Sequence, residues 1–287
     1  MTDMVLVTCA ALPDGEVGGA SLLEELAVRG IAARWAAWDD PQVDWGAARL
    51  VAVRSPWDYE GRRDEFLAWA RSVEARTRLV NPARALAWNT YKSYLLDLAA
   101  SALPVVPTVC AEDEGELPPA IARLAPAVVK PRVGASGRGV VVFDGRPGGA
   151  PGLDESRLEA GPWVVQPLVE SIHTEGELSV FVFGGEPASA VRKLPGDGEI
   201  RVHEEYGGRT VPVPVSEEAA TLAHRTVTAA ERILEVPLPY ARVDLMRLDG
   251  GVLAVSELEV TEPGLYLDVL PENAKPYADA MAALLSH

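Results

Sequence analysis

A lysine and a glycine-rich segment stand together near the middle of the sequence. In AVVKPRVGASGRGVVVF, an apolar run ends at Lys130 and Pro131, residues 134–139 carry three glycines, and a second apolar run begins at Val140. Glycines between two strands let backbone N–H groups approach an anion closely, and a lysine at a buried strand end costs desolvation unless an anion neutralises it. The segment neither opens a helix nor ends in Gly-Lys-Ser/Thr, so it is not a dinucleotide fingerprint or a P-loop. It indicates a hairpin over phosphates, or an ordinary tight turn.

A second group of residues that could do chemistry is acidic. In RVDLM, Arg242 and Asp244 share one face of an expected strand because side chains repeat every two residues, and Glu257 and Glu259 do the same in SELEV. The Asp-Gly-Gly turn at 249–251 would bring the strands side by side. Three facing carboxylates repel one another unless a cation lies among them, and Mg²⁺ prefers oxygen ligands. The alternative is a solvated acidic sheet face.

Composition narrows the class of protein. The chain has 287 residues, of which 48% are hydrophobic, so it can bury a sizeable core. A net charge of −16 argues against general nucleic-acid binding, although a small anion needs only a few local cations. The absence of a long apolar run and of a basic N-terminal flank leads us to expect a cytoplasmic protein without a membrane partner. Cys9 and Cys110 are expected to be buried, reduced thiols.

The elements that must position these residues follow from periodicity. Strands at 4–9 and 50–55 alternate with helices at 21–30, capped by Ser21, and 63–75, which predicts a small parallel α/β unit. A helix at 89–101, capped by Asn89 or Thr90, leads into strands and antiparallel hairpins. We therefore expect α/β followed by α+β. The later elements are strands at 126–131, 139–145 and 162–169, a hairpin at 176–194, a helix at 217–234, strands at 240–248 and 252–260, and a final helix at 276–287.

Together, these motifs resemble the ATP-grasp superfamily. VVKP with GASGRGV is similar to its first ATP-binding lysine and flexible glycine loop, VVQPLV to its adenine-side hinge, and ARVDLM with SELEVTEPGL to its metal-binding strands. Where that superfamily commonly has Glu-x-Asn, Glu259 takes the Asn place, which retains an oxygen ligand and adds a negative charge. RSPWDY, NTYKSYLLDL and ELEVTEPGLYL resemble a branch similar in fold to glutathione synthetase, which includes the cyclo-ligase that forms D-cycloserine from O-ureido-D-serine.

The resemblance implies an ATP-grasp fold with a specific division of the chain. Residues 1–85 would form an N-terminal, substrate-side α/β domain, and residues 86–287 the ATP-grasp region. Within that region, about 104–168 would form the small glycine-loop lobe, and 86–103 with 169–287 the large metal-binding lobe. The two lobes would clasp ATP. The cofactors implied are ATP and Mg²⁺, with Mn²⁺ as the second candidate ion.

The resemblance also implies roles for single residues, each with a plainer alternative. Lys92 is equally a solvated helix residue, Arg201 can pair with Glu204 or Glu205, and Tyr59 can be a pocket wall. The residues expected to bind ATP are Lys92, Lys130, Gly134, Ser136, Gly137, Arg138, Gly139, Gln166, Leu168, Val169 and Glu177. Those expected to hold the metal are Asp244, Glu257 and Glu259; those expected to stabilise the transferred phosphate are Lys193, Arg201 and Arg242; those expected to contact substrate are Arg54 and Tyr59.

The implied activity is that of an ATP-dependent ligase acting on a small amino acid derivative. A carboxyl-like group would be activated as an acyl phosphate and attacked by an amine, within the same molecule as in D-cycloserine formation or from a second one. An intermolecular peptide or amide ligase is the first alternative, and a nucleotide-binding module without chemistry is the second. A homodimer is an open expectation.

Overall fold

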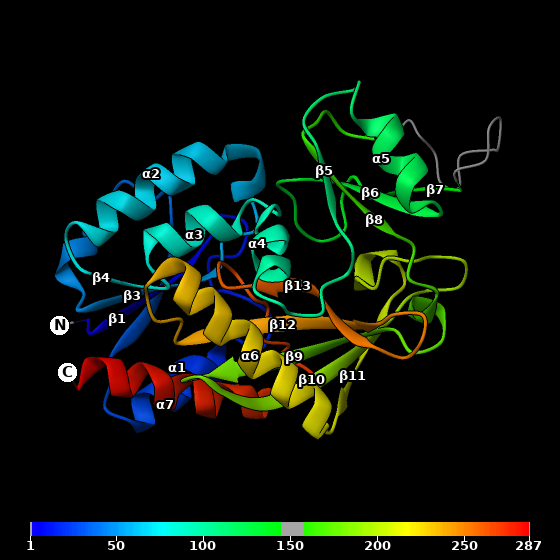
Figure 1. Cartoon of the computed structure of the whole chain (residues 1–287). Helices are drawn as coiled ribbons and strands as arrows, with labels where there is room; N and C mark the ends of the chain where they lie inside the picture. Colours follow the sequence, from blue (N-terminus) through cyan, green and yellow to red (C-terminus); the bar gives the residue numbers. More distant parts are fainter. Residues whose placement is uncertain (1, 145–157, 287) are drawn as a thin grey trace.

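A computed structural model of the protein describes residues 2–144 and 158–286. These residues form one parallel and two antiparallel sheets, with helices packed against them (Figure 1). Gly145 and His287, the last residues of two predicted elements, lie outside the described part. Within it, no helix combines the length and the apolar character needed to cross a bilayer.

The N-terminal sheet is parallel and has the strand order β2-β1-β3-β4. This confirms the predicted α/β unit. β2 and β4 were not predicted, because β2 is a largely half-exposed edge strand and β4 has only three residues. The elements of this region are β1 (Met4–Thr8), α1 (Ala20–Val28), β2 (Ala33–Ala37), β3 (Leu50–Ser55), α2 (Arg63–Glu74), β4 (Arg78–Val80) and α3 (Ala83–Asn89).

The small lobe is an antiparallel sheet of order β5-β8-β6-β7, at the upper right in Figure 1. The glycine segment joins β6 to β7, which pair with Ala127 opposite Phe143, so the predicted hairpin is confirmed. Cys110 on β5 is half-buried, and the expectation of a buried thiol holds only for Cys9. The elements are β5 (Val109–Ala111), α5 (Leu117–Leu124), β6 (Ala127–Pro131), β7 (Val141–Phe143) and β8 (Trp163–Pro167).

The large lobe contains an antiparallel sheet of order β11-β10-β9-β12-β13. The predicted hairpins and the helix at 217–234 are confirmed. Apolar residues of α4 and α6 pack together with Val243 and Leu245 of the sheet in one core. The elements are α4 (Tyr94–Ala100), β9 (Glu177–Phe183), β10 (Glu186–Leu194), β11 (Arg209–Val213), α6 (Glu217–Leu234), β12 (Tyr240–Arg247), β13 (Leu253–Glu259) and α7 (Ala274–Leu285).

Two predicted helix starts are wrong. The hydroxyl of Ser21 donates to the carbonyl of Gly18 at 2.8 Å, and no side chain caps α1. Asn89 ends α3 instead of capping a longer helix, because its side chain is used elsewhere. Its amide donates to the Leu258 carbonyl at 2.6 Å and accepts from the Val260 N–H at 2.9 Å, which ties α3 to β13.

The N-terminal sheet and the large lobe share a hydrophobic core. Met4 and Leu6 of β1 belong to the same buried cluster as Phe181 of β9, Tyr240 of β12 and Tyr277 of α7. Helix α7 packs against α1, although it lies at the far end of the sequence (Figure 1). The division of the chain near residue 85 remains a prediction. The residues on its two sides pack into one common core.

Candidate active site

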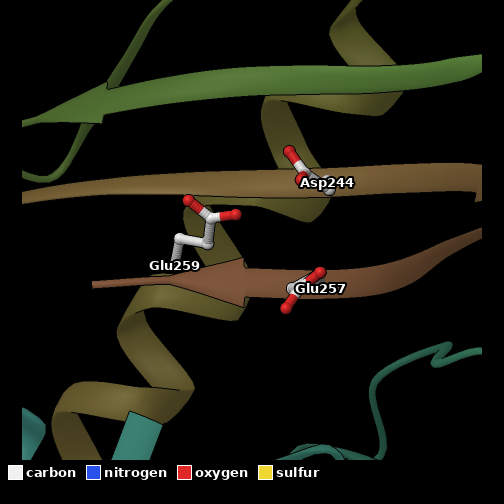
Figure 2. A group of neighbouring side chains, drawn as sticks. All are labelled: Asp244, Glu257 and Glu259. Carbon is white, nitrogen blue, oxygen red and sulfur yellow. The ribbon is translucent and has the colours of Figure 1, made fainter. Parts of the chain in front are cut away.

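The acidic residues of β12 and β13 come together as the sequence predicts. The antiparallel register places Asp244 opposite Glu257 and Arg242 opposite Glu259. Figure 2 shows the three carboxylates projecting from the two neighbouring strands, and one oxygen of each lies within 4.8 Å of the others. All three line a cavity of about 450 Å³ between the lobes. The alternating Val243 and Leu258 face the core on the other side.

Charge distinguishes the three acids. Burial acts to raise the pKa of Asp244, but Arg242 and Lys193 hold it well below its ordinary range; Arg242 donates two 2.9 Å hydrogen bonds and Lys193 one at 3.1 Å. Burial raises the pKa of Glu259 to about 8, since the attraction of Arg242 is opposed by repulsion from Asp244 and Glu257. A divalent cation would offset this repulsion, and three carboxylates are oxygen donors of the kind that Mg²⁺ prefers. The donor set therefore fits Mg²⁺.

Three lysines lie around the acids: two form ion pairs with them and one does not. Lys92 forms an ion pair with Glu257, and Lys193 pairs with Glu177 at 2.5 Å and with Asp244 at 3.1 Å. Lys130, on β6, has no ion-pair partner among residues 2–144 and 158–286, and burial lowers its pKa although Glu257 opposes the shift. A half-buried lysine that lines a cavity without a partner suits an anionic ligand.

The glycine loop closes over the cavity and reaches the N-terminal region. Residues 134–138 line the cavity, and Gly137 and Gly139 have φ values of 70° and 66°, which favour glycine. The carboxylate of Glu60 accepts a hydrogen bond from the Ala135 N–H at 2.8 Å and forms an ion pair with Arg138. If Arg138 contacts phosphate as predicted, its guanidinium group must bind both the phosphate and Glu60.

The side of the cavity expected to meet adenine is also in place. Gln166, Leu168 and Val169 line it, and the Gln166 amide donates to the Thr108 hydroxyl at 3.0 Å. Glu177 lines the same cavity, but Lys193 and a 2.9 Å bond from the Ser256 hydroxyl occupy its carboxylate. Its predicted contact with ribose remains a prediction.

Arg201 lines the cavity but has a different partner from those considered. It pairs with Glu199, and not with Glu204 or Glu205, and its guanidinium carbon lies 3.6 Å from the centre of the Tyr206 ring. The added Cβ of a non-glycine residue at Gly137 would lie 3.3 Å from the Arg201 side chain. Arg201 therefore lies next to the glycine loop, and its predicted action on the transferred phosphate remains a prediction.

Comparison with known proteins decides the family. The family model for the ATP-grasp domain of prokaryotic glutathione synthetase matches residues 97–264, more than half of the chain. The protein belongs to the ATP-grasp family. A second model, for the N-terminal domain of D-cycloserine synthetase DcsG, matches residues 4–81.

ATP-grasp relatives match both the sequence and the structure. The cycloserine biosynthesis protein DcsG of Streptomyces lavendulae is 33% identical over 276 residues, which cover 92% of each chain. The crystal structure of D-cycloserine synthetase DcsG has a TM-score of 0.84 at 31% identity and covers 98% of this chain and 99% of that one. Glutathione synthetase of Synechococcus elongatus is 28% identical over 191 residues, 66% of this chain and 55% of that protein. Like these relatives, the protein is an ATP-dependent ligase.

Arg54, one of the two residues predicted to contact substrate in this ATP-grasp enzyme, lies in the interior of the protein. Arg54 is fully buried and does not line the cavity, so its predicted contact with substrate finds no support in the structure. Its guanidinium donates to Glu16 at 2.5 Å and to the Pro263 carbonyl at 2.7 Å, and it lies over the ring of Tyr240. An arginine needs such partners when it is withdrawn from water. Arg54 thus supports Glu16, which does line the cavity.

The other predicted substrate residue, Tyr59, does line the cavity, together with acids that sequence reasoning missed. The Tyr59 hydroxyl donates to Glu262 at 2.8 Å, and burial raises the pKa of Glu262 to about 7. Glu262 lies three residues after Glu259, within the SELEVTEPGL stretch. Its closeness in sequence to a predicted metal ligand is the only feature that could have marked it as a site residue. Glu16, in a loop, also lines the cavity, and Glu60 lies beside the glycine loop in a short 3-10 helix, Tyr59–Arg62; no sequence pattern marks either acid.

Proposed function

We propose that the protein uses ATP and Mg²⁺ to activate the carboxyl-like group of a small amino acid derivative as an acyl phosphate. The observation that carries this is the convergence of Asp244, Glu257 and Glu259 with Lys130 in one cavity covered by the glycine loop. Asp244, Glu257 and Glu259 would hold Mg²⁺, which neutralises charge on the phosphates when bound. Lys130 and the loop N–H groups would hold the phosphates.

The remaining residues act around the transferred phosphoryl group. Arg242 and Lys193 are held by ion pairs with Asp244, which supports a role for both in offsetting the negative charge that the acyl phosphate would develop. A nitrogen nucleophile then attacks the acyl carbon, the bond from that carbon to the phosphate oxygen breaks, and phosphate leaves. Exclusion of water by the closed glycine loop would protect the acyl phosphate from hydrolysis.

We further propose that this nitrogen belongs to the same molecule, so that the product is a ring. The similarity to DcsG over 92% of both chains and the TM-score of 0.84 support cyclisation of the kind that gives D-cycloserine. Intermolecular ligation is the second candidate, favoured by the 30% identity over 142 residues to a probable alpha-L-glutamate ligase of Legionella pneumophila.

An ADP-release assay tests both proposals. The purified protein is incubated with ATP, Mg²⁺ and one candidate at a time, in parallel samples with and without an added amino acid as a second amine. The candidates are O-ureido-D-serine, its L enantiomer, amino acid amides and dipeptides. ADP release with O-ureido-D-serine alone, accompanied by a cyclic product in mass spectrometry, supports cyclisation. ADP release that requires a second amine favours intermolecular ligation. The absence of ADP release with every candidate would contradict the proposed substrate class.

A further inference from the structure

Glu262 differs from the other acids that line the active-site cavity. It is only 9% exposed. Within residues 2–144 and 158–286, every other buried or half-buried carboxylate of the cavity forms an ion pair with a lysine or an arginine. Those pairs are Glu16 with Arg54, Glu177 with Lys193, Asp244 with Arg242 and Lys193, Glu257 with Lys92, and Glu259 with Arg242. Among the described residues, Glu262 accepts a hydrogen bond only from the neutral hydroxyl of Tyr59, at 2.8 Å, and the positive charges of Lys92 and Arg242 act on it from beyond ion-pair distance.

The surroundings of Glu262 suit a small cation. Trp57 and Tyr266 line the same cavity beside Tyr59, and the Trp57 indole N–H donates to the main-chain carbonyl of Glu262 at 3.4 Å. Aromatic faces attract an ammonium group through their negative quadrupoles. A nearly buried carboxylate with no cation in direct contact is costly, and a positively charged ligand that contacts it reduces that cost.

Glu16, the other acid at this end of the cavity, is already committed. One of its oxygens accepts from Arg54 at 2.5 Å, and the other accepts from the Leu265 N–H at 2.9 Å. Asp268 also lines the cavity, but it is exposed, so water can solvate its charge. Glu262 is therefore the acid best placed to bind a cation brought by the substrate.

We propose that Glu262 binds the ammonium group of the substrate and makes the enzyme select amino acids over hydroxy acids. The inference rests on the proposed function and adds a specificity-determining residue to it. Glu262 lies three residues after Glu259, one of the three acids that fit Mg²⁺. In an α-amino acid a single carbon separates the ammonium from the carboxyl group. Such a substrate can therefore place its carboxyl group toward the metal-binding acids and its ammonium group on Glu262.

The test compares an amine with its hydroxy analogue in wild type and in Glu262→Gln. Glutamine keeps the size of the side chain and can still accept from Tyr59, so only the charge is removed. The probes are O-ureido-D-serine and the same molecule with a hydroxyl in place of the amino group, each with saturating ATP and Mg²⁺. If another derivative is the most active in the ADP-release assay, that compound and its hydroxy analogue replace them.

We expect wild type at pH 8 to prefer the amine by about 100-fold in kcat/KM, because the hydroxy analogue brings no positive charge to pair with Glu262. Glu262→Gln should lose about tenfold or more of that preference through a higher KM for the amine, with the KM for ATP unchanged. Glu186→Gln is the matched control: the same charge is removed from an exposed residue outside the cavity, and the preference should stay as in wild type.

Two outcomes would overturn the assignment while leaving the ligase function standing. The first is ADP release by wild type that treats the amine and the hydroxy analogue alike. The second is a Glu262→Gln enzyme that retains the wild-type preference, or one in which both compounds and ATP lose the same factor. A wild type that releases no ADP with any amino acid derivative refutes the proposed function, and the inference falls with it.

Discussion

Substitution of Glu60 tests whether the N-terminal region holds the glycine loop closed. The carboxylate of Glu60 makes two contacts with the loop: an ion pair with Arg138 and a 2.8 Å hydrogen bond from the Ala135 N–H. Glu60→Gln removes the ion pair but leaves an oxygen that can accept from Ala135. Glu60→Ala removes both contacts. The two variants therefore separate the contribution of charge from that of the hydrogen bond.

The expected magnitudes follow from exposure. The side chains of Arg138 and Glu60 are 46% and 21% exposed, so solvent screens the ion pair and its loss costs about 1 kcal/mol at most. Loss of the half-buried hydrogen bond adds about 1 kcal/mol. The population of the open loop should rise about fivefold in Glu60→Gln and about 30-fold in Glu60→Ala, since 1–2 kcal/mol corresponds to factors of this size.

Trypsin cleavage after Arg138 in nucleotide-free protein measures this population, because cleavage of a transiently open segment follows the equilibrium between its open and closed forms. The rate of that cut should rise by the factors above while the melting temperature stays near that of wild type. Glu65→Gln removes a more exposed partner of Arg62 and serves as the control. Cleavage of Glu60→Ala at the wild-type rate would refute the reasoning.

Four further changes have expected outcomes. Glu257→Ala should lower kcat by about 10³-fold with an unchanged circular dichroism spectrum, since it removes a metal-binding acid; wild-type turnover would remove the metal assignment. Lys130→Ala should raise the Kd for ATP about 10–100-fold in calorimetry through the loss of a charge-assisted contact, and an unchanged Kd would contradict its contact with phosphate. Arg54→Leu should lower the free energy of unfolding in urea by about 3–5 kcal/mol because Glu16 loses its cation, and Arg54→Leu/Glu16→Leu should recover part of the loss. Glu262→Gln should be neutral to stability near pH 3, where this carboxyl is protonated in both the folded and the unfolded state. The same variant should stabilise the EDTA-treated protein by about 1–3 kcal/mol at pH 8, because the pKa of Glu262 is raised to about 7 only in the folded state; equal stability of variant and wild type at both pH values would count against an uncompensated charge.

The three acids proposed to bind Mg²⁺ could be placed from sequence because two local rules agreed. Side chains alternate between the two faces of a strand, so Asp244 lies on the same face as Arg242. The Asp-Gly-Gly turn then determines which residues of the next strand lie opposite them. Lys130 was found in the same way, at the end of an apolar strand before a glycine segment. Each of these inferences needed only residues close together in the chain.

Arg54 could not be placed in this way. It follows an apolar run and precedes Ser-Pro-Trp, which says nothing about the face that receives the guanidinium. Its partner Glu16 lies 38 residues earlier, and the carbonyl of Pro263 lies 209 residues later. The same holds for Asn89, which the local pattern marked as a helix cap, whereas β13 engages its amide. When the partner of a buried polar group lies far away in the sequence, no local periodic pattern reveals the pair.

The core shared by Met4, Phe181, Tyr240 and Tyr277 limits how this enzyme can be recombined with its relatives. A chimera that exchanges residues 1–85 alone would set a foreign α1 and β1 against the native α7 and β9, with mismatched side-chain volumes in a buried interface. The smallest segment that can be transplanted as a matched unit is discontinuous and includes α7. New substrate preferences in this architecture are therefore reached more readily by changing cavity residues one at a time than by shuffling its N-terminal region.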